Sequence, residues 1–197
     1  MDSDRLQRVL ARIDQLNSED PTTELVEGFV RPHELVYSQR LTDWVLRLNP
    51  SASEALRIAA RGQHVRRWTI PRSQYEMNRR GYLRWRETLK TYHAETVAAL
   101  TREAGYPEEA VERVRLLILK KHLATDPDTQ TLEDALCLVF LETQFKDLKQ
   151  KTADETMAEV IRKTWKKMSA KGRAEALRLP LAPDERAFLD RALSKAA

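Results

Sequence analysis

The sequence has very few of the residues that build covalent cross-links or flexible turns. Its 197 residues include one cysteine, Cys137, and five glycines. A single cysteine excludes a disulfide within the chain, and Cys137 lies in the apolar run 135–141, where a thiol packs as a small hydrophobic side chain. We therefore expect a protein of a reducing compartment, and we predict a cytoplasmic location.

Long apolar runs and common catalytic signatures are also missing. No run approaches the roughly 20 apolar residues of a membrane-spanning helix, and the N-terminal stretch MDSDRLQRVLARIDQL reads as an amphipathic helix without a signal-peptide core. We therefore expect no membrane partner. The chain has no glycine-rich phosphate loop, no GxSxG, no CxxC and no HExxH. The enzyme classes that those motifs define are excluded.

The abundant residues favour helices over strands. Hydrophobic residues make up 42% of the chain and charged residues 32%, and Ala, Leu, Arg, Glu and Lys are frequent. We therefore predict an all-α fold with one buried core, which suits this length. We expect an N-terminal helix and linker over residues 1–25, a helical core over 26–152, and a C-terminal helical extension over 153–197 packed on the core.

Apolar spacing and capping residues predict the individual helices. Ser53 is an N-cap, Gly105 is a C-terminal stop signal, and Pro32 and Pro107 suit first helical turns. A proline at position 71 should end the third helix near Trp68. The expected helices cover residues 3–16, 33–48, 53–68, 81–104, 107–122, a segment from Thr129 or Thr131 to 150, and 153–168, 171–178 and 184–193.

The four histidines of the chain fall in four different expected helices. They are His33, His64, His93 and His122, at separations of 31, 29 and 29 residues, and Asp134 follows them. Histidines on antiparallel helices can meet in a bundle core, where imidazoles and a carboxylate bind a divalent cation. Such a donor set suits Zn, Fe, Mn or Ni better than Mg or Ca. The alternative is four separate core or surface histidines, because this number is ordinary for the length.

Residues 57–86 carry a second signal, which is arginine without lysine. This stretch contains nine arginines and a single acid, Glu76. The guanidinium fork binds phosphate or carboxylate through two hydrogen bonds and stacks on aromatic rings. We predict a phosphate-binding or substrate-binding role for Arg40, Arg61, Arg66, Arg72 and Trp68. Arginines interleaved with aromatics also describe a surface for single-stranded nucleic acid, and a plain solvated basic face is the third reading.

The order of the histidines and the aspartate resembles the HD-domain phosphohydrolase superfamily. HELVYSQR is similar to the segment with its first histidine, IAARGQHVRRW to the helix that carries its His-Asp pair, and HAETVAALTREAGY to the segment with an additional histidine. LILKKHL and TLEDALCLVF complete the order. The resemblance covers residues 29–149 and implies an HD-domain-like helical bundle with a metal. RGQH, RRWTIPR, GYLRWR, LEDALCLVFLE and TWKKMS more closely resemble a helical family known only as a domain of unknown function.

The sequence departs from the HD pattern at the paired aspartate, where it has Val65. The resemblance implies that this aspartate binds the metal and bridges two metals in dinuclear members, so Val65 argues against a dinuclear site. The last ligand has alternatives, because Glu133 and Glu142 lie close to Asp134 in sequence.

Two functions follow as hypotheses. The first is a metal-dependent phosphohydrolase acting on a nucleotide or another small phosphorylated compound, on a phosphomonoester or a phosphodiester. In it His33, His64 and Asp134 hold the metal with help from His93 or His122, and Arg61, Arg66 and Arg72 neutralise charge in the transition state.

The second hypothesis is an inactive HD-like module that binds a nucleotide or an RNA, such as a tRNA, through the same arginines. Because Arg61 lies one helical turn before His64, both hypotheses place Arg61 beside the histidine.

Overall fold

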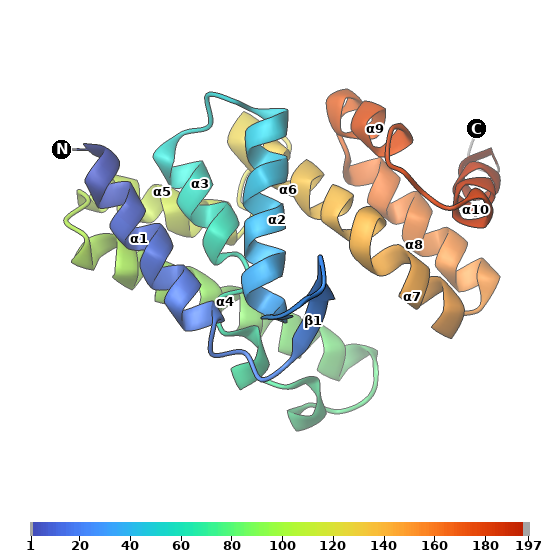
Figure 1. Ribbon diagram of the computed structural model, residues 1–197, viewed down its shortest axis with the longest axis horizontal. Helices are drawn as coiled ribbons and strands as arrows, with labels where there is room; N and C mark the ends of the chain where they lie inside the picture. The colour runs from blue at the N-terminus through green and yellow to red at the C-terminus, as the bar shows by residue number, and fades with distance from the viewer. Residues whose placement is uncertain (1, 195–197) are drawn as a thin grey trace. The chain divides into compact units, whose positions relative to one another are not determined.

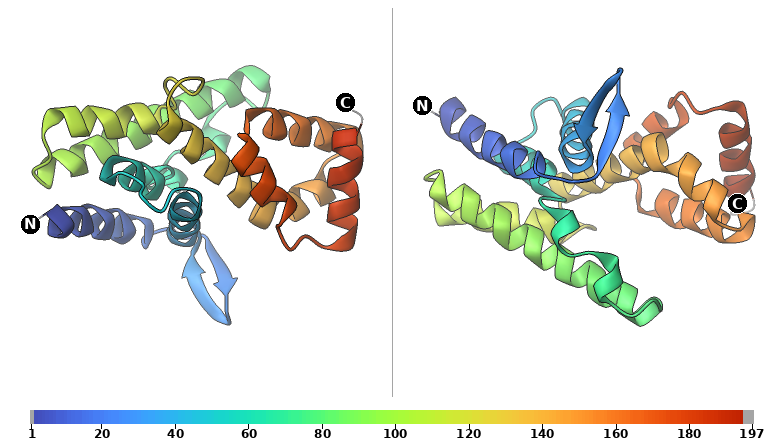
Figure 2. Two further views of the ribbon diagram at one scale, coloured as in Figure 1. Left: turned by 90° about the horizontal axis from the view of Figure 1, so that it is seen from above. Right: turned by 60° about the horizontal axis from the view of Figure 1, so that its bottom comes forward.

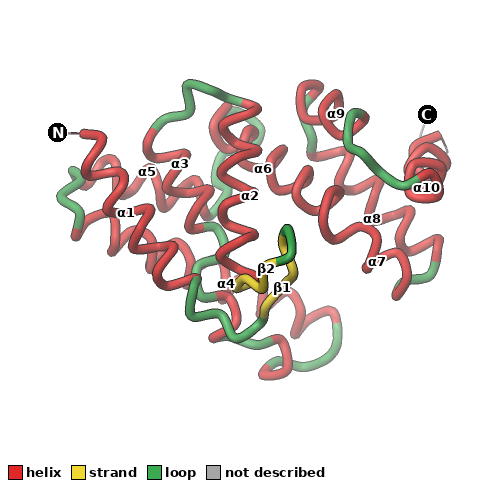
Figure 3. Tube along the Cα trace, viewed as in Figure 1, coloured by secondary structure: helices red, strands yellow, loops and turns green. Residues whose placement is uncertain are grey.

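The computed structural model describes residues 2–194 and divides the chain into two compact units, with the division between His122 and Leu123. Helices dominate both units, and the only sheet in the described part of the chain is a two-stranded hairpin (Figures 1 and 3). The predicted all-α class is therefore confirmed. No helix among residues 2–194 is long and apolar enough to cross a membrane.

The first unit contains a hairpin, five α-helices and two short 3-10 helices in its described residues. The elements are α1 (Asp2–Asn17), β1 (Thr23–Val26), β2 (Phe29–Pro32), α2 (His33–Leu48), α3 (Glu54–Gly62), η1 (Arg67–Thr69), η2 (Arg72–Gln74), α4 (Arg79–Glu103) and α5 (Glu108–Ile118).

Helix α3 lies at the centre of this unit and packs against α1, α2, α4 and α5 (Figure 1). Its Ile58, Ala59 and Ala60 have no exposed surface, and the alanines let neighbouring helices approach closely. Helix α1 packs against α3 with Val9 and Ile13 fully buried or nearly so. The N-terminal helix is thus part of the core, whereas the sequence suggested a segment separate from it.

Several helix ends follow the predicted signals. The Leu56 N–H donates to the Ser53 side chain at the start of α3, and Gly105 has a φ of 84° just after α4. Helix α3, however, ends at Gly62 and does not continue to Trp68. A Cβ added at Gly62 would lie 2.3 Å from a methyl group of Val97, so α3 crosses α4 at van der Waals contact there.

The hairpin of residues 23–32 was not predicted, because its residues were assigned partly to a linker. β1 and β2 pair antiparallel with Leu25 opposite Val30, and the turn residues Glu27 and Gly28 have φ values of 50° and 85°. Two consecutive positive φ angles are typical of the tight turn that matches strand twist. The hairpin leaves Leu25 and Val30 more than two thirds exposed, at 72% and 71%.

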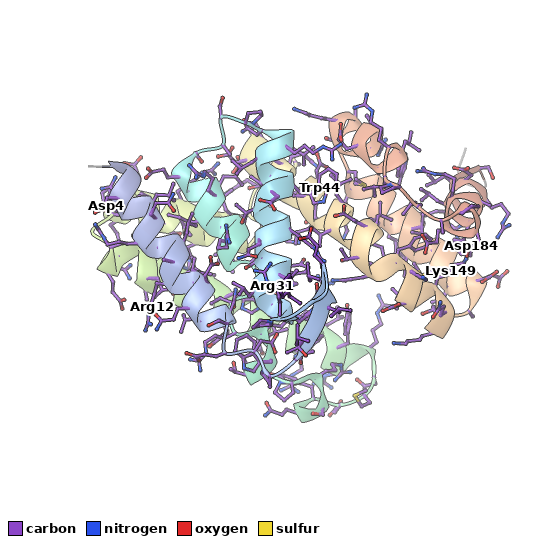
Figure 4. The ribbon with its side chains drawn as sticks, in the orientation of Figure 1. Asp4, Arg12, Arg31, Trp44, Lys149 and Asp184 are labelled. Atoms are coloured by element: carbon purple, nitrogen blue, oxygen red, sulfur yellow. The ribbon has the colours of Figure 1, made fainter. Side chains whose placement is uncertain are left out.

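The second unit is an assembly of helices around its own core. Its elements are α6 (Pro127–Val139), the π-helical segment η3 (Phe140–Gln144), α7 (Phe145–Lys151), α8 (Asp154–Lys167), α9 (Ala170–Leu177) and α10 (Pro183–Ser194). Met157 and Ile161 of α8 and Leu189 of α10 are buried. An ion pair joins α7 to α10, with Lys149 Nζ 2.7 Å from Asp184 Oδ2 (Figure 4).

The division into units differs from the predicted division after residues 25 and 152. The apolar run of α6 packs within the second unit, where α6 contacts α8 and α9. Helix α6 therefore joins the C-terminal helices in one compact unit, although the sequence assigned it to the same core as the histidine helices.

Candidate functional site

A buried acid and two histidines come together in the first unit from three different elements. The His64 Nδ1 lies 3.5 Å from the Glu34 Oε2, and the His64 and His93 ring centroids are 5.9 Å apart. Tyr37 stacks on His64, with ring centroids 4.3 Å apart and planes 9° from parallel. We call this group the Glu34–His64–His93 cluster. It combines a carboxyl group with two imidazoles, which are the common acid–base groups of enzymes.

Each member is placed by a local feature of the chain. Glu34 begins the first turn of α2, where its N–H donates to the Asp20 Oδ2. His64 follows the end of α3, and His93 lies in the middle of α4. After His64 the chain turns back through Arg66, which has a φ of 50° and donates its N–H to the Asn17 Oδ1. This turn brings the next residue to the cluster.

That next residue is Arg67, which supplies a cation. Its Nε lies 3.8 Å from the Glu34 Oε1, and its guanidinium lies over the Trp85 ring, 4.6 Å from the centroid. The Trp85 Nε1–H donates to the Ile70 carbonyl, which fixes the indole that supports Arg67. Burial lowers the pKa of Arg67, and the side chain still keeps 32% exposure. The guanidinium is thus held in place and remains open to solvent.

His93 has one ring nitrogen without a partner. Its Nδ1 lies 2.9 Å from the Val65 carbonyl oxygen. Because a carbonyl only accepts hydrogen bonds, the Nδ1 carries the hydrogen and the Nε2 is left as an acceptor. The Nε2 is buried and has no hydrogen-bond partner. Burial, followed by the neighbouring His64, lowers the pKa of His93 to about 3, so the imidazole is neutral at physiological pH.

His64 is also held neutral. Burial is the largest cause that lowers its pKa well below the ordinary value, and the nearby positive charges of Arg67, Lys120 and His33 add to it. The side chain keeps 24% exposure, so one edge of the cluster is accessible from solvent.

Glu34 is the acid whose charge changes near neutral pH. Burial raises its pKa to about 7 and outweighs the attraction of Arg67, which acts in the opposite direction. Its Oε2 is buried and has no hydrogen-bond partner. At neutral pH the carboxyl therefore exists in both protonation states, as a general acid or base requires.

The predicted metal ligands separate into different places. His33 lies 2.7 Å from the Glu24 carboxylate through its Nδ1, and His122 is exposed with a φ of 61°. Asp134 belongs to the second unit, where it accepts hydrogen bonds from the backbone and side chain of Ser169.

Only His64 and His93 of the predicted set lie side by side. No group of three or more His, Cys, Asp or Glu side chains that could hold a metal ion is found among residues 2–194. The residues as placed do not fit the metal that the HD resemblance implies. Val65 agrees with this, because its side chain is fully buried and only its carbonyl oxygen takes part in the cluster, through His93.

The predicted phosphate ligands have partners of their own in the protein. Arg61 donates to both carboxylate oxygens of Asp14 on α1, at 3.1 and 3.2 Å. Arg40 lies 2.6 Å from Glu24.

The loop arginines likewise have protein partners. Arg66 pairs with Glu19 at 3.6 Å, and Arg72 donates to the carbonyls of residues 75, 76 and 78. Trp68 is half-buried in the middle of η1. Their binding roles stay predictions.

Sequence reasoning missed Glu34, Arg67 and Tyr37 as members of the site. A glutamate in the first turn of a helix is ordinarily explained by the helix dipole, so Glu34 gave no signal of burial. It follows His33 directly, and successive residues on a helix point about 100° apart. Glu34, and not the predicted ligand His33, is therefore the residue of this turn that lies beside the His64 ring.

Comparison with known proteins identifies one family. The sequence matches, over residues 7–189, the family described as Domain of unknown function (DUF4202). No curated protein and no solved structure matches the chain. The predicted resemblance to a domain of unknown function is confirmed, and the resemblance to HD-domain phosphohydrolases stays a prediction.

Proposed function

We propose that this chain, which belongs to the family described as a domain of unknown function (DUF4202), binds a nucleotide or another small phosphorylated compound at the Glu34–His64–His93 cluster. The observation that supports this most strongly is that two of the buried side-chain polar atoms without hydrogen-bond partners, Glu34 Oε2 and His93 Nε2, belong to this one cluster. A buried polar atom without a partner costs roughly 1–3 kcal/mol, and a bound molecule that supplies the missing hydrogen bonds removes that cost.

The chemistry of the cluster describes the ligand. The His93 Nε2 accepts a hydrogen bond and therefore needs a donor, such as a sugar hydroxyl or an amino group. Glu34 donates to the ligand when protonated and accepts from it when ionised. A nucleotide carries both kinds of group, and its phosphate adds negative charge.

The charges around the cluster favour an anion. Arg67 carries a fork of donors beside His64, and the positive charges of Arg86 and Lys120 also act on His64. The only carboxyl group within the cluster is Glu34, and below about pH 7 it is neutral. Protonation of Glu34 leaves Arg67 without a carboxylate within the cluster, and a phosphate group can take that place. Phosphate binding should therefore be tighter at pH 6 than at pH 8.

Isothermal titration calorimetry tests this with inorganic phosphate, ribose 5-phosphate and AMP at pH 6 and pH 8. Arg67→Lys keeps the charge and removes the fork, so it should weaken AMP binding by roughly tenfold or more, about 1.4 kcal/mol. Arg115→Lys is the matched control, because Arg115 is paired with Glu95 on the surface. Equal affinities of wild type and Arg67→Lys, or no heat with any of the three ligands at millimolar concentration, would refute the proposal.

Hydrolysis of the bound phosphate ester is a second candidate, and the raised pKa of Glu34 favours it. A carboxyl group with a pKa of about 7 can take a proton from water or give one to a leaving oxygen at neutral pH. His64, 3.5 Å away, would orient that carboxyl group. The HD resemblance implies Zn, Fe, Mn or Ni, but no group of three or more potential ligands is found among residues 2–194, so no step of the proposed hydrolysis is assigned to a metal and the metals enter only as conditions of the assay.

The assay uses p-nitrophenyl phosphate as a phosphomonoester and bis-p-nitrophenyl phosphate as a phosphodiester, each with and without those four metals. A rate that changes with pH around 7 and is lost in Glu34→Gln supports hydrolysis. If AMP binds with the expected response to Arg67→Lys while neither ester is cleaved under any condition, the chain is a binding module.

A further inference from the structure

The start of α4 carries an arginine surface outside the Glu34–His64–His93 cluster, although the charge of one member, Arg86, also acts on His64. Arg79, Arg80, Arg84 and Arg86 are all exposed there. Large apolar side chains are exposed among them, namely Met77 at 80%, Tyr82 at 42% and Leu83 at 54%. We call these arginines and exposed apolar residues the α4 arginine surface. Of the first two turns of α4, only Gly81 is buried. In the right-hand view of Figure 2 this end of α4 extends beyond the ends of α1 and α3.

None of these four arginines has a carboxylate partner within salt-bridge distance among the described residues. Three other exposed arginines do have one, since Arg8 is paired with Asp4, Arg102 with Glu108 and Arg178 with Glu175. The α4 arginines lie within two turns of one helix and repel one another, and no carboxylate of the described part of the chain lies at salt-bridge distance to offset that repulsion.

The position of these arginines on the helix adds a second unfavourable electrostatic interaction to their mutual repulsion. Arg79 and Arg80 occupy the first turn of α4, and no acidic residue lies in that turn. The N-terminal end of a helix carries a partial positive charge, so cations there are unfavourable by a few tenths of a kcal/mol or more each. A bound polyanion would neutralise these arginines and remove the unfavourable interaction of their charges with the N-terminal end of α4.

The aromatic rings of this surface indicate that the polyanion is a nucleic acid with unpaired bases. Tyr82 and Trp85 have ring centroids 6.0 Å apart, and the Arg86 guanidinium lies 5.8 Å from the Tyr82 centroid. Unpaired bases stack on exposed aromatic rings and on guanidinium planes, and they do so with little regard to sequence. Trp85 is half-buried with Arg67 close over its ring, whereas Tyr82 is 42% exposed and Arg86 lies farther from it, so Tyr82 is the ring more open to stacking.

A shallow groove continues the surface along α4. It has a volume of about 560 Å³, and its lining consists of Ile70, Arg84, Glu87, Thr88, Thr91 and Tyr92, where Glu87 is paired with Lys90. Arg84 thus belongs to the arginine surface and to the groove. A chain of bases that contacts Arg79, Arg80 and Tyr82 can extend into this groove past Arg84.

We propose that the α4 arginine surface binds single-stranded RNA. The arginines contact successive phosphates, and Tyr82 stacks on a base. An anionic membrane is disfavoured, because the exposed apolar residues are few and charged residues separate them, whereas a helix that inserts into a lipid interface presents a continuous apolar face. This inference goes beyond the proposed small-ligand function, since none of the cluster residues belongs to the surface.

The test uses fluorescence anisotropy of a 5′-fluorescein-labelled 12-nucleotide RNA of mixed sequence with the full chain, from 50 to 300 mM KCl. The triple variant Arg79→Ala/Arg80→Ala/Arg84→Ala should bind at least tenfold more weakly at 50 mM KCl. For single strands the slope of log K against log salt is about −0.7 for each neutralised phosphate, so the loss of three contacts should reduce its magnitude by about 2.

Two matched controls separate this surface from general electrostatics. Arg8→Ala/Arg102→Ala/Arg178→Ala removes the same number of positive charges from paired, exposed positions and should leave the affinity within about twofold of wild type. Tyr82→Ala should weaken RNA binding by roughly tenfold, because stacking on one base contributes about 1–3 kcal/mol, and Tyr82→Phe should bind like wild type.

The proposal is overturned if wild type shows no binding at 50 mM KCl, if both triple variants lose affinity equally, or if the α4 triple variant binds like wild type. It is also overturned if vesicles with 30% phosphatidylserine bind more tightly than RNA and lose binding in the same variant. The α4 triple variant keeps every cluster residue, so it should still bind AMP like wild type. Loss of RNA binding with normal AMP binding therefore separates the two proposals.

Discussion

Replacing Glu34 by glutamine should stabilise the protein at alkaline pH and leave its stability at acid pH nearly unchanged. The side chain is 7% exposed, and burial raises the pKa of the carboxyl group from 4.5 to about 7. The folded state therefore keeps the proton up to about pH 7, whereas the unfolded chain releases it near pH 4.5. Between these values the folded state binds more protons, so the free energy of unfolding of the wild type falls as pH rises.

The size of the effect follows from the shift. A difference of 2.5 pKa units, at about 1.36 kcal/mol per unit, corresponds to about 3 kcal/mol that the ionised carboxyl group costs the folded state above pH 7. Glutamine cannot ionise and does not carry this cost. The advantage of Glu34→Gln over wild type should therefore grow by about 3 kcal/mol between pH 4 and pH 8.

Urea denaturation followed by circular dichroism at pH 4, 6 and 8 measures this difference directly. Any change in packing caused by the amide is the same at each pH and cancels in the comparison. Glu103→Gln, at an exposed position at the end of α4, controls for the loss of one carboxyl group. If the stability difference between Glu34→Gln and wild type varies by less than about 1 kcal/mol over this range, the carboxyl group is not destabilised by burial and the acid–base argument fails.

Three further substitutions test the framework of each unit, all by urea denaturation. Arg61→Leu should lower the free energy of unfolding by about 1 kcal/mol because half-buried Asp14 loses its partner, and an unchanged midpoint would show that this pair does not anchor α1. Gly62→Ala should cost about 1–3 kcal/mol through the clash with Val97, and a second change, Val97→Ala, should relieve part of that clash; failure of the double variant to do so would place the cause elsewhere. Asp134→Ala should destabilise the second unit by about 2–3 kcal/mol, because the buried carboxylate accepts the hydrogen bonds at the start of α9, and a neutral effect would refute that capping role.

The helices could be predicted from the sequence where a local signal decides their ends. Ser53, Gly105 and Pro107 act through hydrogen bonds or dihedral angles of their own segment, so their effect is visible without the fold. The end of α3 at Gly62 has no such local signal, and Gly62 lies against Val97, 35 positions later in the sequence. No local pattern contains that information.

The candidate site was only partly predictable for the same reason. His64 and His93 were selected by residue type, and the structure brings them together. Glu34 belongs to the site because it is buried, and Arg67 belongs to it because the chain turns at Arg66, which has a positive φ. Neither property can be predicted from residue type or spacing. His122 had the expected spacing, but α5 ends at Ile118 and His122 lies outside the helix that was meant to present it.

Val65 links the departure from the HD pattern to the chemistry of the cluster. Its side chain packs in the core, and its carbonyl holds the Nδ1 hydrogen of His93. An aspartate at this position would place a charge where Val65 has no exposed surface, and that charge would favour protonated imidazoles nearby. Burial keeps His64 and His93 neutral, and the uncharged valine does not oppose it, so Glu34 is the group of the cluster that titrates near pH 7. The valine at position 65 adds no second carboxylate beside the imidazoles, and the cluster keeps two neutral rings beside one titrating carboxyl group, an arrangement suited to acid–base chemistry and to binding an anion.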